Sequence, residues 1–428
     1  MMSSGKIHEV TIKRLGLRGD GIGKSPDGQL YIAGALPGEA VRARIGAKRA
    51  DGFAATLEEI VVASEHRVTA PCPHFGTCGG CATQTLDDAS YEAWKQEMVV
   101  SAVKRAGLNP TLVAPMVRTA SDGRRRAEFA AFRPRAKNSK TFFGFHGRAS
   151  HQIVNLDTCL IVRSTIAALI PKLREVLSDV VPPGASWDVL VTEVDNGLDL
   201  QIIANHSPGP DASMALAMFA ESEDLARVSW LANDGVEPIA MRRTPTLDLS
   251  GTVIEVPPGA FLQASAEAER LLSGLVCAAV QGSTKIADLY CGVGTFALPL
   301  AAAGANVFAV DGAGPAVEAM ARGAGKAGFG GRIKTEIRDL VRRPMMAADL
   351  KFTETVVFDP PRAGAAHQVE EIVKSPVERV IAVSCNPATF AKDAGALGKG
   401  GFRLEAVTPV DQFVWSGHVE LVAAFSRA

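Results

Sequence analysis

The feature that most constrains the fold of this chain is a glycine loop that follows a short apolar run. Residues 285–290 have the composition of a buried parallel strand, and they lead into the loop Cys291–Thr295. The two glycines of the loop have no side chains, so a ligand can approach the backbone there. We predict a helix over Phe296–Ala303, with Thr295 as its N-cap and Gly304 as its C-terminal stop.

A second apolar run, Asn306–Val310, predicts the next strand, and Asp311 ends it about twenty residues past the loop. A carboxylate at this place can accept both hydroxyls of a ribose. The pattern therefore predicts a nucleoside-containing cofactor. Two glycines and an acid serve dinucleotides and S-adenosylmethionine alike, and a tight strand-to-helix turn without a ligand is the remaining alternative.

Strand and helix patterns alternate around this loop, beginning with a helix expected over Glu267–Val280. Four more apolar runs predict strands: Thr355–Phe358, Arg379–Val383, Arg403–Val410 and His418–Phe425. This alternation is typical of an open, mostly parallel α/β sheet, which binds ligands at the carboxyl ends of its strands. Polar or reactive residues stand at or near such ends: Asp288, Asp311, Asp339, Asp359 and Cys385.

The rest of the chain has a different pattern. Residues 1–62 alternate apolar and polar positions in short runs between glycine-containing turns, which predicts a small closed β-barrel. An amphipathic helix is expected over Leu86–Ala106, and strands follow with a hairpin turn at Asp195–Gly197. We therefore predict three domains: a barrel over 1–62, a central, mainly β domain over 63–255, and an α/β domain over 256–428.

Four cysteines form a candidate metal site. Cys72, Cys78 and Cys81 lie at spacings of six and three in a loop with three glycines, and Cys159 could complete the set. An odd total of seven cysteines favours metal binding or catalysis over disulfides. Structural zinc sites usually show paired short spacings at both ends. The spacing thus favours an iron-sulfur cluster, with structural zinc as the alternative.

The net charge of −1 hides a basic stretch in the centre of the chain. Between Lys104 and Arg148, eleven Lys or Arg stand against two acidic residues, which gives a local charge of +9. Five phenylalanines interleave with these arginines: Phe129, Phe132, Phe142, Phe143 and Phe145. Such a face can stack unpaired bases and hold phosphates, although strand alternation should bury about half of the rings. We expect an RNA partner for this stretch.

No membrane role is expected. The most apolar run, Phe296–Val310, is too short to span a bilayer and is broken by proline and glycine. The N-terminus lacks the apolar region of a secretory signal. These two features predict a cytoplasmic protein.

Two residues near the C-terminus are candidates for catalysis. Asn386 can cap the following helix and Pro387 suits its first turn, so the Cys385 thiol should lie at a helix N-terminus. The partial positive charge there favours the nucleophilic thiolate. Glu420 interrupts an apolar strand, where an unpaired carboxylate is costly to bury and is often functional. The alternatives are a packing role for Cys385 and a structural ion pair for Glu420.

Several of these motifs, in this order, resemble the RNA 5-methyluridine methyltransferases. The resemblance rests on Asp288–Phe296, Asp359–Arg362, Ser384–Pro387, His418–Glu420 and the four cysteines, and on residues 15–23 and 35–39, which resemble a TRAM domain. It implies a Rossmann-like S-adenosylmethionine methyltransferase domain after an RNA-binding barrel. Ser265 stands where the family often has asparagine, and Asp311 stands where glutamate is common.

The resemblance also implies roles for particular residues. Cys385 is expected to be the nucleophile and Glu420 the base. The expected contacts to S-adenosylmethionine are Gln263, Tyr290, Thr295, Asp311, Asp339 and Asp359, and the expected ligands of a 4Fe-4S cluster are Cys72, Cys78, Cys81 and Cys159. The expected reaction is methylation of uridine carbon 5 through a covalent cysteine adduct.

We expect a monomer that acts on ribosomal RNA, specifically 23S rRNA, in preference to transfer RNA. Two other classes of function remain open from the sequence. One is a nicotinamide-dependent oxidoreductase with an electron-transfer cluster. The other is a noncatalytic RNA-binding protein that keeps a cofactor fold.

Overall fold

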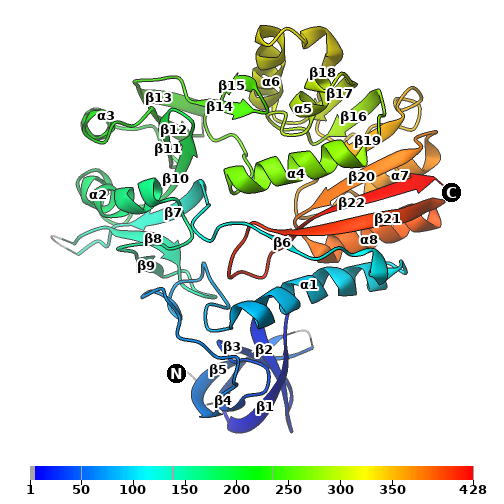
Figure 1. Ribbon diagram of the computed structural model, residues 1–428. Coiled ribbons are helices and arrows are strands. Elements are labelled where there is room, and N and C mark those ends of the chain that lie inside the picture. Colours follow the sequence, from blue (N-terminus) through cyan, green and yellow to red (C-terminus); the bar gives the residue numbers. More distant parts are fainter. Residues whose placement is uncertain (1–4, 50, 137–138, 234, 428) are drawn as a thin grey trace. The chain divides into compact units, whose positions relative to one another are not determined.

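The computed structural model describes residues 5–49, 51–136, 139–233 and 235–427 (Figure 1). Lys137 of the basic stretch lies outside these ranges. The chain forms two compact units, each discontinuous in sequence. The first comprises residues 1–98, 146–154 and 413–418, and the second comprises residues 99–145, 155–412 and 419–428. The three-domain division at residues 62 and 255 stays a prediction.

The N-terminal strands close into a barrel, as predicted. The strands are β1 (Ile7–Leu15), β2 (Asp20–Ser25), β3 (Gly28–Ala33), β4 (Ala40–Arg49) and β5 (Gly52–Val62), in the order β1-β2-β3-β5-β4. Buried Val10, Ile12, Leu30 and Val41 fill its interior. Strand β2 contains two glycines and one large apolar residue, Ile22. A Cβ at Gly21 would lie 2.6 Å from the Ala35 carbonyl oxygen, so the glycine is needed for close approach of the chain.

The helix α1 (Asp88–Arg105) confirms the predicted amphipathic helix, and Gly107 follows it with φ of +76°. A short 3-10 helix (Pro110–Leu112) comes next.

A seven-stranded sheet forms the central part of the chain. Its strands are β7 (Arg126–Phe132), β8 (Phe142–His146), β9 (Ile153–Asn155), β10 (Ser186–Val194), β11 (Gly197–Ile203), β12 (Arg227–Ala232) and β13 (Gly235–Met241), in the order β13-β12-β11-β10-β7-β8-β9. Helices α2 (Ser164–Val180) and α3 (Pro210–Ser222) pack against it. The predicted hairpin at Asp195–Gly197 joins β10 to β11.

The phenylalanines of the basic stretch divide between core and surface, as the strand pattern predicts. Phe129 and Phe143 are buried, whereas Phe132 and Phe142 are exposed. Phe145 is partly buried and stacks on Phe129 with a ring-centroid separation of 4.8 Å. The two exposed rings remain available to a ligand.

The hairpin of β14 (Thr246–Leu249) and β15 (Thr252–Glu255) precedes helix α4 (Ala266–Ala279). Ser265 is the N-cap of α4, and its Oγ accepts a hydrogen bond from the Ala268 amide at 3.0 Å. The serine that departs from the family pattern therefore has a structural role here.

An eight-stranded, mostly parallel sheet completes the chain and confirms the predicted alternation. Its strands are β6 (Val117–Arg118), β16 (Lys285–Leu289), β17 (Asn306–Asp311), β18 (Ile333–Ile337), β19 (Thr355–Phe358), β20 (Arg379–Ser384), β21 (Phe402–Asp411) and β22 (Glu420–Arg427). The order is β18-β17-β16-β19-β20-β22-β21-β6, and β22 runs antiparallel between β20 and β21. The connections contain α5 (Ala297–Ala302), α6 (Gly314–Lys326), a 3-10 turn (Gly330–Arg332), α7 (Ala366–Lys374) and α8 (Pro387–Lys399).

Burial on both faces holds this sheet together. Helix α4 crosses in front of it and helices α7 and α8 lie behind it in Figure 1. Val357, Ile381 and Val422 from three neighbouring strands share one apolar cluster with Leu272 of α4. Each such side chain contributes roughly 1.5–3 kcal/mol when fully buried. The packed strands give a rigid edge on which polar residues can be placed.

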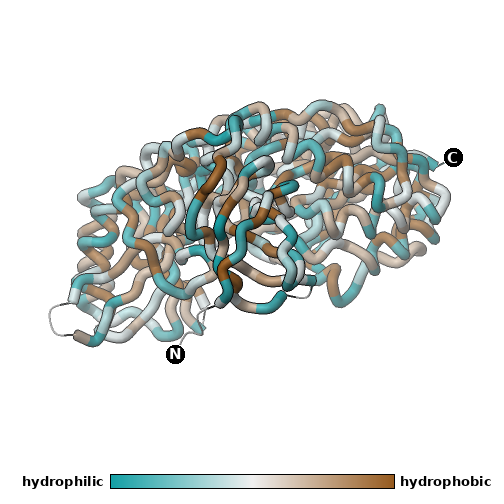
Figure 2. Tube along the Cα trace, turned by 90° about the horizontal axis from the view of Figure 1, so that it is seen from below, coloured by the Kyte–Doolittle hydropathy of each residue, from teal (hydrophilic) through white to brown (hydrophobic). Residues whose placement is uncertain are grey.

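Hydrophobic and hydrophilic stretches alternate along the whole trace in Figure 2. Among the residues that the structure describes, no helix has the length and apolar character needed to cross a membrane.

Candidate active site

One edge of the eight-stranded sheet gathers the candidate catalytic residues. Strands β19 and β20 are parallel and end at this edge, so Asp359 and Cys385 follow them there. Strand β22 runs the other way and begins at the same edge with Glu420. Because Ser384 pairs with Leu421, Cys385 comes directly beside Glu420. The reversal of one strand thus joins the candidate nucleophile to the candidate base.

The glycine loop has the open backbone that a ligand requires. Tyr290, Gly292 and Gly294 have φ of +63°, +52° and +95°. A Cβ at Gly292 would meet nothing within 4 Å, whereas a Cβ at Gly294 would lie 2.7 Å from Met320 Cγ. The loop is therefore open at the first glycine and closely packed at the second.

Asp311, the last residue of β17, holds this loop in place. Its Oδ2 accepts a hydrogen bond from the Gly292 amide at 2.9 Å, and its Oδ1 accepts one from the Ala313 amide at 2.7 Å. Each carboxylate oxygen keeps a second lone pair for a hydroxyl group.

Tyr290 and Asp339 lie close to Asp311. Burial, followed by the charges of Asp393, Asp311 and Asp339, raises the pKa of Tyr290 to about 12. Asp339 Oδ1 accepts hydrogen bonds from the Val341 and Arg342 amides at 3.0 and 3.2 Å. The structure therefore brings together three of the residues that the sequence analysis assigned to the cofactor.

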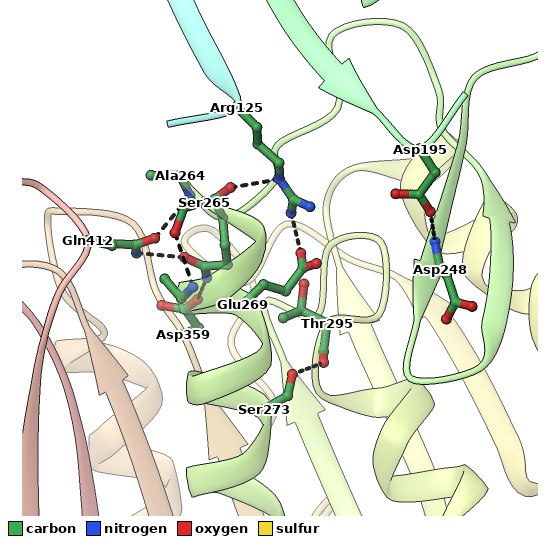
Figure 3. Close-up of polar contacts among 12 residues, drawn as sticks. Arg125, Asp195, Asp248, Ala264, Ser265, Glu269, Ser273, Thr295, Asp359 and Gln412 are labelled. Carbon is green, nitrogen blue, oxygen red and sulfur yellow. Dashed lines mark hydrogen bonds and ion pairs between the residues drawn. The ribbon is translucent and has the colours of Figure 1, made fainter. Parts of the chain in front are cut away.

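The predicted cap at Thr295 is wrong. Helix α5 begins at Ala297, and its N-cap position falls on Phe296, whose side chain makes no capping bond. The Thr295 carbonyl instead accepts a hydrogen bond from Ser273 Oγ at 2.8 Å (Figure 3). The glycine loop extends one residue further than the pattern indicated, so Thr295 anchors the loop to α4 through its backbone.

Two buried glutamines link the candidate base to Asp359. Gln263 donates from Nε2 to Asp359 Oδ2 at 3.1 Å. Gln412 donates from Nε2 to Gln263 Oε1 at 2.8 Å and to Glu420 Oε2 at 3.0 Å. Sequence reasoning missed Gln412. Gln412 directly follows β21 at the same edge of the sheet. A search for polar residues after strands that included amide side chains would have found it.

Arg125 holds the same segment from another direction. Its Nε donates to the Gln263 carbonyl at 3.2 Å, and its Nη2 pairs with Glu269 at 2.5 Å (Figure 3). The side chains of Arg125 and Glu269 are 4% and 6% exposed. Arg125 belongs to the basic stretch, but its buried pairing with Glu269 gives it a structural role.

Burial leaves the carboxyl groups of the site with unusually high pKa values. Burial, and then the charge of Asp359, raises the pKa of Glu420 to about 8, although Gln412 and Arg362 act in the opposite direction. Burial also raises the pKa of Asp359 to about 7, against the hydrogen bond from Gln263. These acids therefore titrate near neutral pH, as a general base needs to do.

Asp288 is a third acid at this edge. It is fully buried, and among the described residues its carboxylate oxygens find no partner of good hydrogen-bond geometry, although the Ala297 amide acts to lower its pKa. Burial, and then the charge of Asp359, raises its pKa well above the usual value. Such a group is kept neutral unless a cation approaches.

The predicted helix terminus at Cys385 is present, but its expected effect on the thiol is not. Asn386 caps α8, because its Oδ1 accepts a hydrogen bond from the Ala388 amide at 3.0 Å. Burial, and then the charges of Glu420 and Asp359, raises the pKa of Cys385 to about 12, while Arg362 lowers it. The prediction of a favoured thiolate is therefore wrong for the chain without ligands. Desolvation and two carboxylates outweigh one helix N-terminus.

The predicted cluster ligands are three cysteines of one loop and the distant Cys159. Cys72 and Cys78 are partly buried free thiols, and burial, with Cys72 contributing, raises the pKa of Cys78. Across the residues that the structure describes, no three or more His, Cys, Asp or Glu side chains are grouped to hold a metal ion. Cys81 belongs to the first compact unit and Cys159 to the second. A cluster held by all four cysteines would draw ligands from both units, and it stays a prediction of the sequence.

Cys277 and Cys291 lie in the apolar packing of the α/β sheet. Cys291 is 3% exposed and Cys277 packs against the same apolar cluster.

Comparison with known sequences places the chain among RNA-modifying enzymes. The family described as tRNA (uracil-5-)-methyltransferase matches residues 333–427. A protein of Brucella suis described as an uncharacterized RNA methyltransferase is 41% identical over 426 residues, which are 100% of this chain and 99% of the relative. The 23S rRNA (uracil(1939)-C(5))-methyltransferase of Aeromonas hydrophila is 30% identical over 424 residues, 98% of this chain and 96% of that protein.

A solved structure shares the fold. The tRNA (uracil-54, C5)-methyltransferase of Pyrococcus abyssi, determined with S-adenosyl-L-homocysteine, has a TM-score of 0.76 and 22% identity. The match covers 98% of this chain and 100% of the other. The two proteins therefore have the same mixed α/β fold.

Proposed function

The chain belongs to the family of RNA uracil-5 methyltransferases, and from this membership we propose that it methylates carbon 5 of a uridine through a covalent adduct with Cys385. Glu420 acts as the base. The observation that supports this assignment best is the pairing of Ser384 with Leu421, which makes the two catalytic candidates neighbours at the sheet edge. Both are then available to one bound base.

The chemistry requires a nucleophile first. Carbon 5 of uracil is a weak nucleophile, so the Cys385 sulfur adds to carbon 6 and the electrons of the carbon 5–carbon 6 double bond move into an enolate. Cys385 must lose its proton for this step. The positive charge of Arg362 acts in that direction, since it lowers the pKa of the thiol. Neutralising Asp359 or Glu420 would remove the opposing charges.

The base completes the reaction. After carbon 5 has gained its methyl group, Glu420 takes the proton from carbon 5. The bond between carbon 6 and the Cys385 sulfur then breaks, which restores the double bond and the thiolate. A pKa near 8 suits this role because the carboxylate can both hold and release a proton near neutral pH.

S-adenosylmethionine would supply the methyl group and a positive charge when bound. The glycine loop fits such a ligand because it is open at Gly292 and because Asp311 keeps lone pairs for ribose hydroxyls. We assign Gln263, Tyr290 and Asp359 to the same ligand, with Asp339 beside them. The carboxyl ends of parallel strands are the usual place for it in a Rossmann-like sheet.

We propose ribosomal RNA, specifically 23S rRNA, as the substrate. The relative that acts on 23S rRNA is 30% identical along nearly the whole chain, whereas the likeness to the tRNA enzyme is in fold. The target base has to leave its stack to reach Cys385. The exposed Phe132 and Phe142 of the central sheet are suited to stack on neighbouring bases.

An iron-sulfur cluster stays a prediction of the sequence. Its support is the spacing of Cys72, Cys78 and Cys81 in one loop. Iron and acid-labile sulfide analysis of the anaerobically purified chain tests it. Equal amounts of iron and sulfide would support the cluster, and zinc without sulfide would support a structural zinc site instead.

The function is tested by nucleoside mass spectrometry of ribosomal and transfer RNA from cells with and without the gene. We expect 5-methyluridine to disappear from 23S rRNA. In vitro, Cys385→Ala should abolish methyl transfer, and Glu420→Gln should accumulate a denaturation-stable adduct of protein and RNA. Full activity of the Cys385→Ala enzyme would refute the covalent mechanism, and loss of 5-methyluridine from tRNA alone would refute the choice of substrate.

A further inference from the structure

We propose that Gln412 is a positioning residue that holds Glu420 and Gln263 in one arrangement, and so links the base to the cofactor side of the site. The proposal rests on the proposed function and deepens it. Gln412 is 6% exposed and lies directly after β21, between the two glutamine-linked acids. It belongs to neither motif that identified Cys385 and Glu420.

Every hydrogen-bonding group of the Gln412 amide is used. Its Oε1 accepts from the Ala264 backbone amide at 3.0 Å (Figure 3). Its Nε2 donates to both Gln263 Oε1 and Glu420 Oε2, at 2.8 and 3.0 Å. A glutamine amide has two N–H donors and one carbonyl, so no group is left over. The side chain is fully satisfied in one orientation.

The direction of this network is determined by the backbone. The Ala264 N–H can only donate, so the oxygen of Gln412 must face it and the nitrogen must face Glu420 and Gln263. Gln263 then has to present its oxygen to Gln412, which turns its own nitrogen toward Asp359. If the Gln412 amide were flipped, its NH₂ group would face the Ala264 N–H and its oxygen would face the Glu420 carboxylate. One backbone donor therefore orients both amides.

The network has a consequence for the base. Gln412 occupies Oε2 of Glu420, which leaves Oε1 to take the proton from carbon 5. The groups whose charges act on Glu420 are Asp359, which opposes its ionisation, and Arg362, which favours it. The Cys385 thiol lies beside it. Of the described neighbours, Gln412 is the one that donates a hydrogen bond to it, and that bond lowers its pKa.

The expected defect is specific to the second half of the reaction. Without Gln412, Glu420 keeps its carboxyl group but loses its orientation and becomes harder to ionise. Removal of the carbon 5 proton should slow while adduct formation continues. A hydrogen bond to a charged group corresponds to about a ten-fold change in the rate of proton removal. Its loss should shift the acid limb of the pH–rate profile upward by about one pH unit.

The experiment uses the full chain, its RNA substrate and S-adenosylmethionine. Gln412→Leu removes the amide at similar volume, and Gln412→Met fills the same space if the leucine variant is unstable. Gln368→Leu is the matched control. Gln368 is 1% exposed and uses its amide to hold the backbone of Met345, at 2.8 and 3.0 Å. Adduct level, single-turnover rates, pH profile and thermal unfolding are measured for each variant.

We expect a denaturation-stable adduct to accumulate with Gln412→Leu, its breakdown to slow about ten-fold, and its pH profile to shift upward. Gln368→Leu should lose stability without accumulating adduct. If both Gln412 variants methylate RNA, break down the adduct at the wild-type rate and keep the wild-type pH–rate profile, the positioning role is overturned. The proposed function would still stand. Absence of uridine methylation in the wild-type chain would overturn the proposed function itself.

Discussion

Replacing Glu420 with glutamine gives a direct test of the electrostatics of the site. The change keeps the shape of the side chain and an oxygen that can accept from Gln412, but it removes the titrating group. In the folded chain the pKa of Glu420 is raised to about 8, mainly by burial and then by Asp359, from an ordinary value of 4.5. Burial of the charged form is therefore unfavourable for folding.

The sign of the effect follows from linkage. The pKa of Glu420 is higher in the folded chain than in the unfolded chain. Below the unfolded-state pKa the side chain is neutral in both states, so it does not destabilise the fold. Stability is lost as the pH rises from there through the folded pKa. Relative to a neutral glutamine, Glu420 should lower the free energy of unfolding by roughly 1 kcal/mol near pH 5.5 and by roughly 4 kcal/mol near pH 8.

The assay is urea unfolding of the wild-type and Glu420→Gln chains at both pH values. The variant should be more stable, and its advantage should grow by roughly 3 kcal/mol between them. Glu405→Gln is the matched control. Glu405 is bonded to Arg379 at 2.6 Å, which lowers its pKa despite the burial that raises it. Both assay pH values lie above the unfolded pKa, so replacing Glu405 should destabilise the chain by a similar amount at each. An advantage of Glu420→Gln that does not change with pH would refute the reasoning.

Two further substitutions test the loop and the buried ion pair. Gly294→Ala places a Cβ 2.7 Å from Met320 Cγ at φ of +95°, so it should cost about 2 kcal/mol or more and weaken binding of S-adenosylhomocysteine in calorimetry. Gly292→Ala, which has open space, should destabilise less, and equal losses of stability would contradict this packing argument. Arg125→Met should cost roughly 3–5 kcal/mol by leaving Glu269 buried without its cation, with the loss growing as the pH rises. Adding Glu269→Gln to the Arg125→Met chain should bring the urea midpoint most of the way back to the wild-type value. If it does not, lost packing and not the unpaired charge causes the destabilisation.

Local patterns predicted the elements of the α/β sheet well. Strand β19 matches the predicted run at Thr355–Phe358, and β20 extends its predicted run by one residue. Asn386 caps its helix as expected. These features depend on short-range properties, namely apolar runs and side chains that bond to nearby amides.

Other features depended on contacts that no local pattern encodes. Strand β2 has little apolar pattern of its own, and its Gly21 is required by the close approach of Ala35. The charge of the basic stretch can be counted in the sequence, whereas the burial of Arg125 against Glu269 cannot. The position of Gln412 after a strand is a local signal, but its bonds to Gln263, Ala264 and Glu420 are formed only by the fold.

The amino-acid sequence by itself determined which residues stand at the ends of strands, since apolar runs and glycine loops are local signals. Which of those ends become neighbours was decided by the tertiary structure, when β22 inserted antiparallel between β20 and β21 and brought Glu420 beside Cys385. The same packing decided the protonation of the site. A pKa depends on the water and charges that surround a group in three dimensions, so the thiol that the helix terminus was expected to ionise is instead held neutral by burial and two acids.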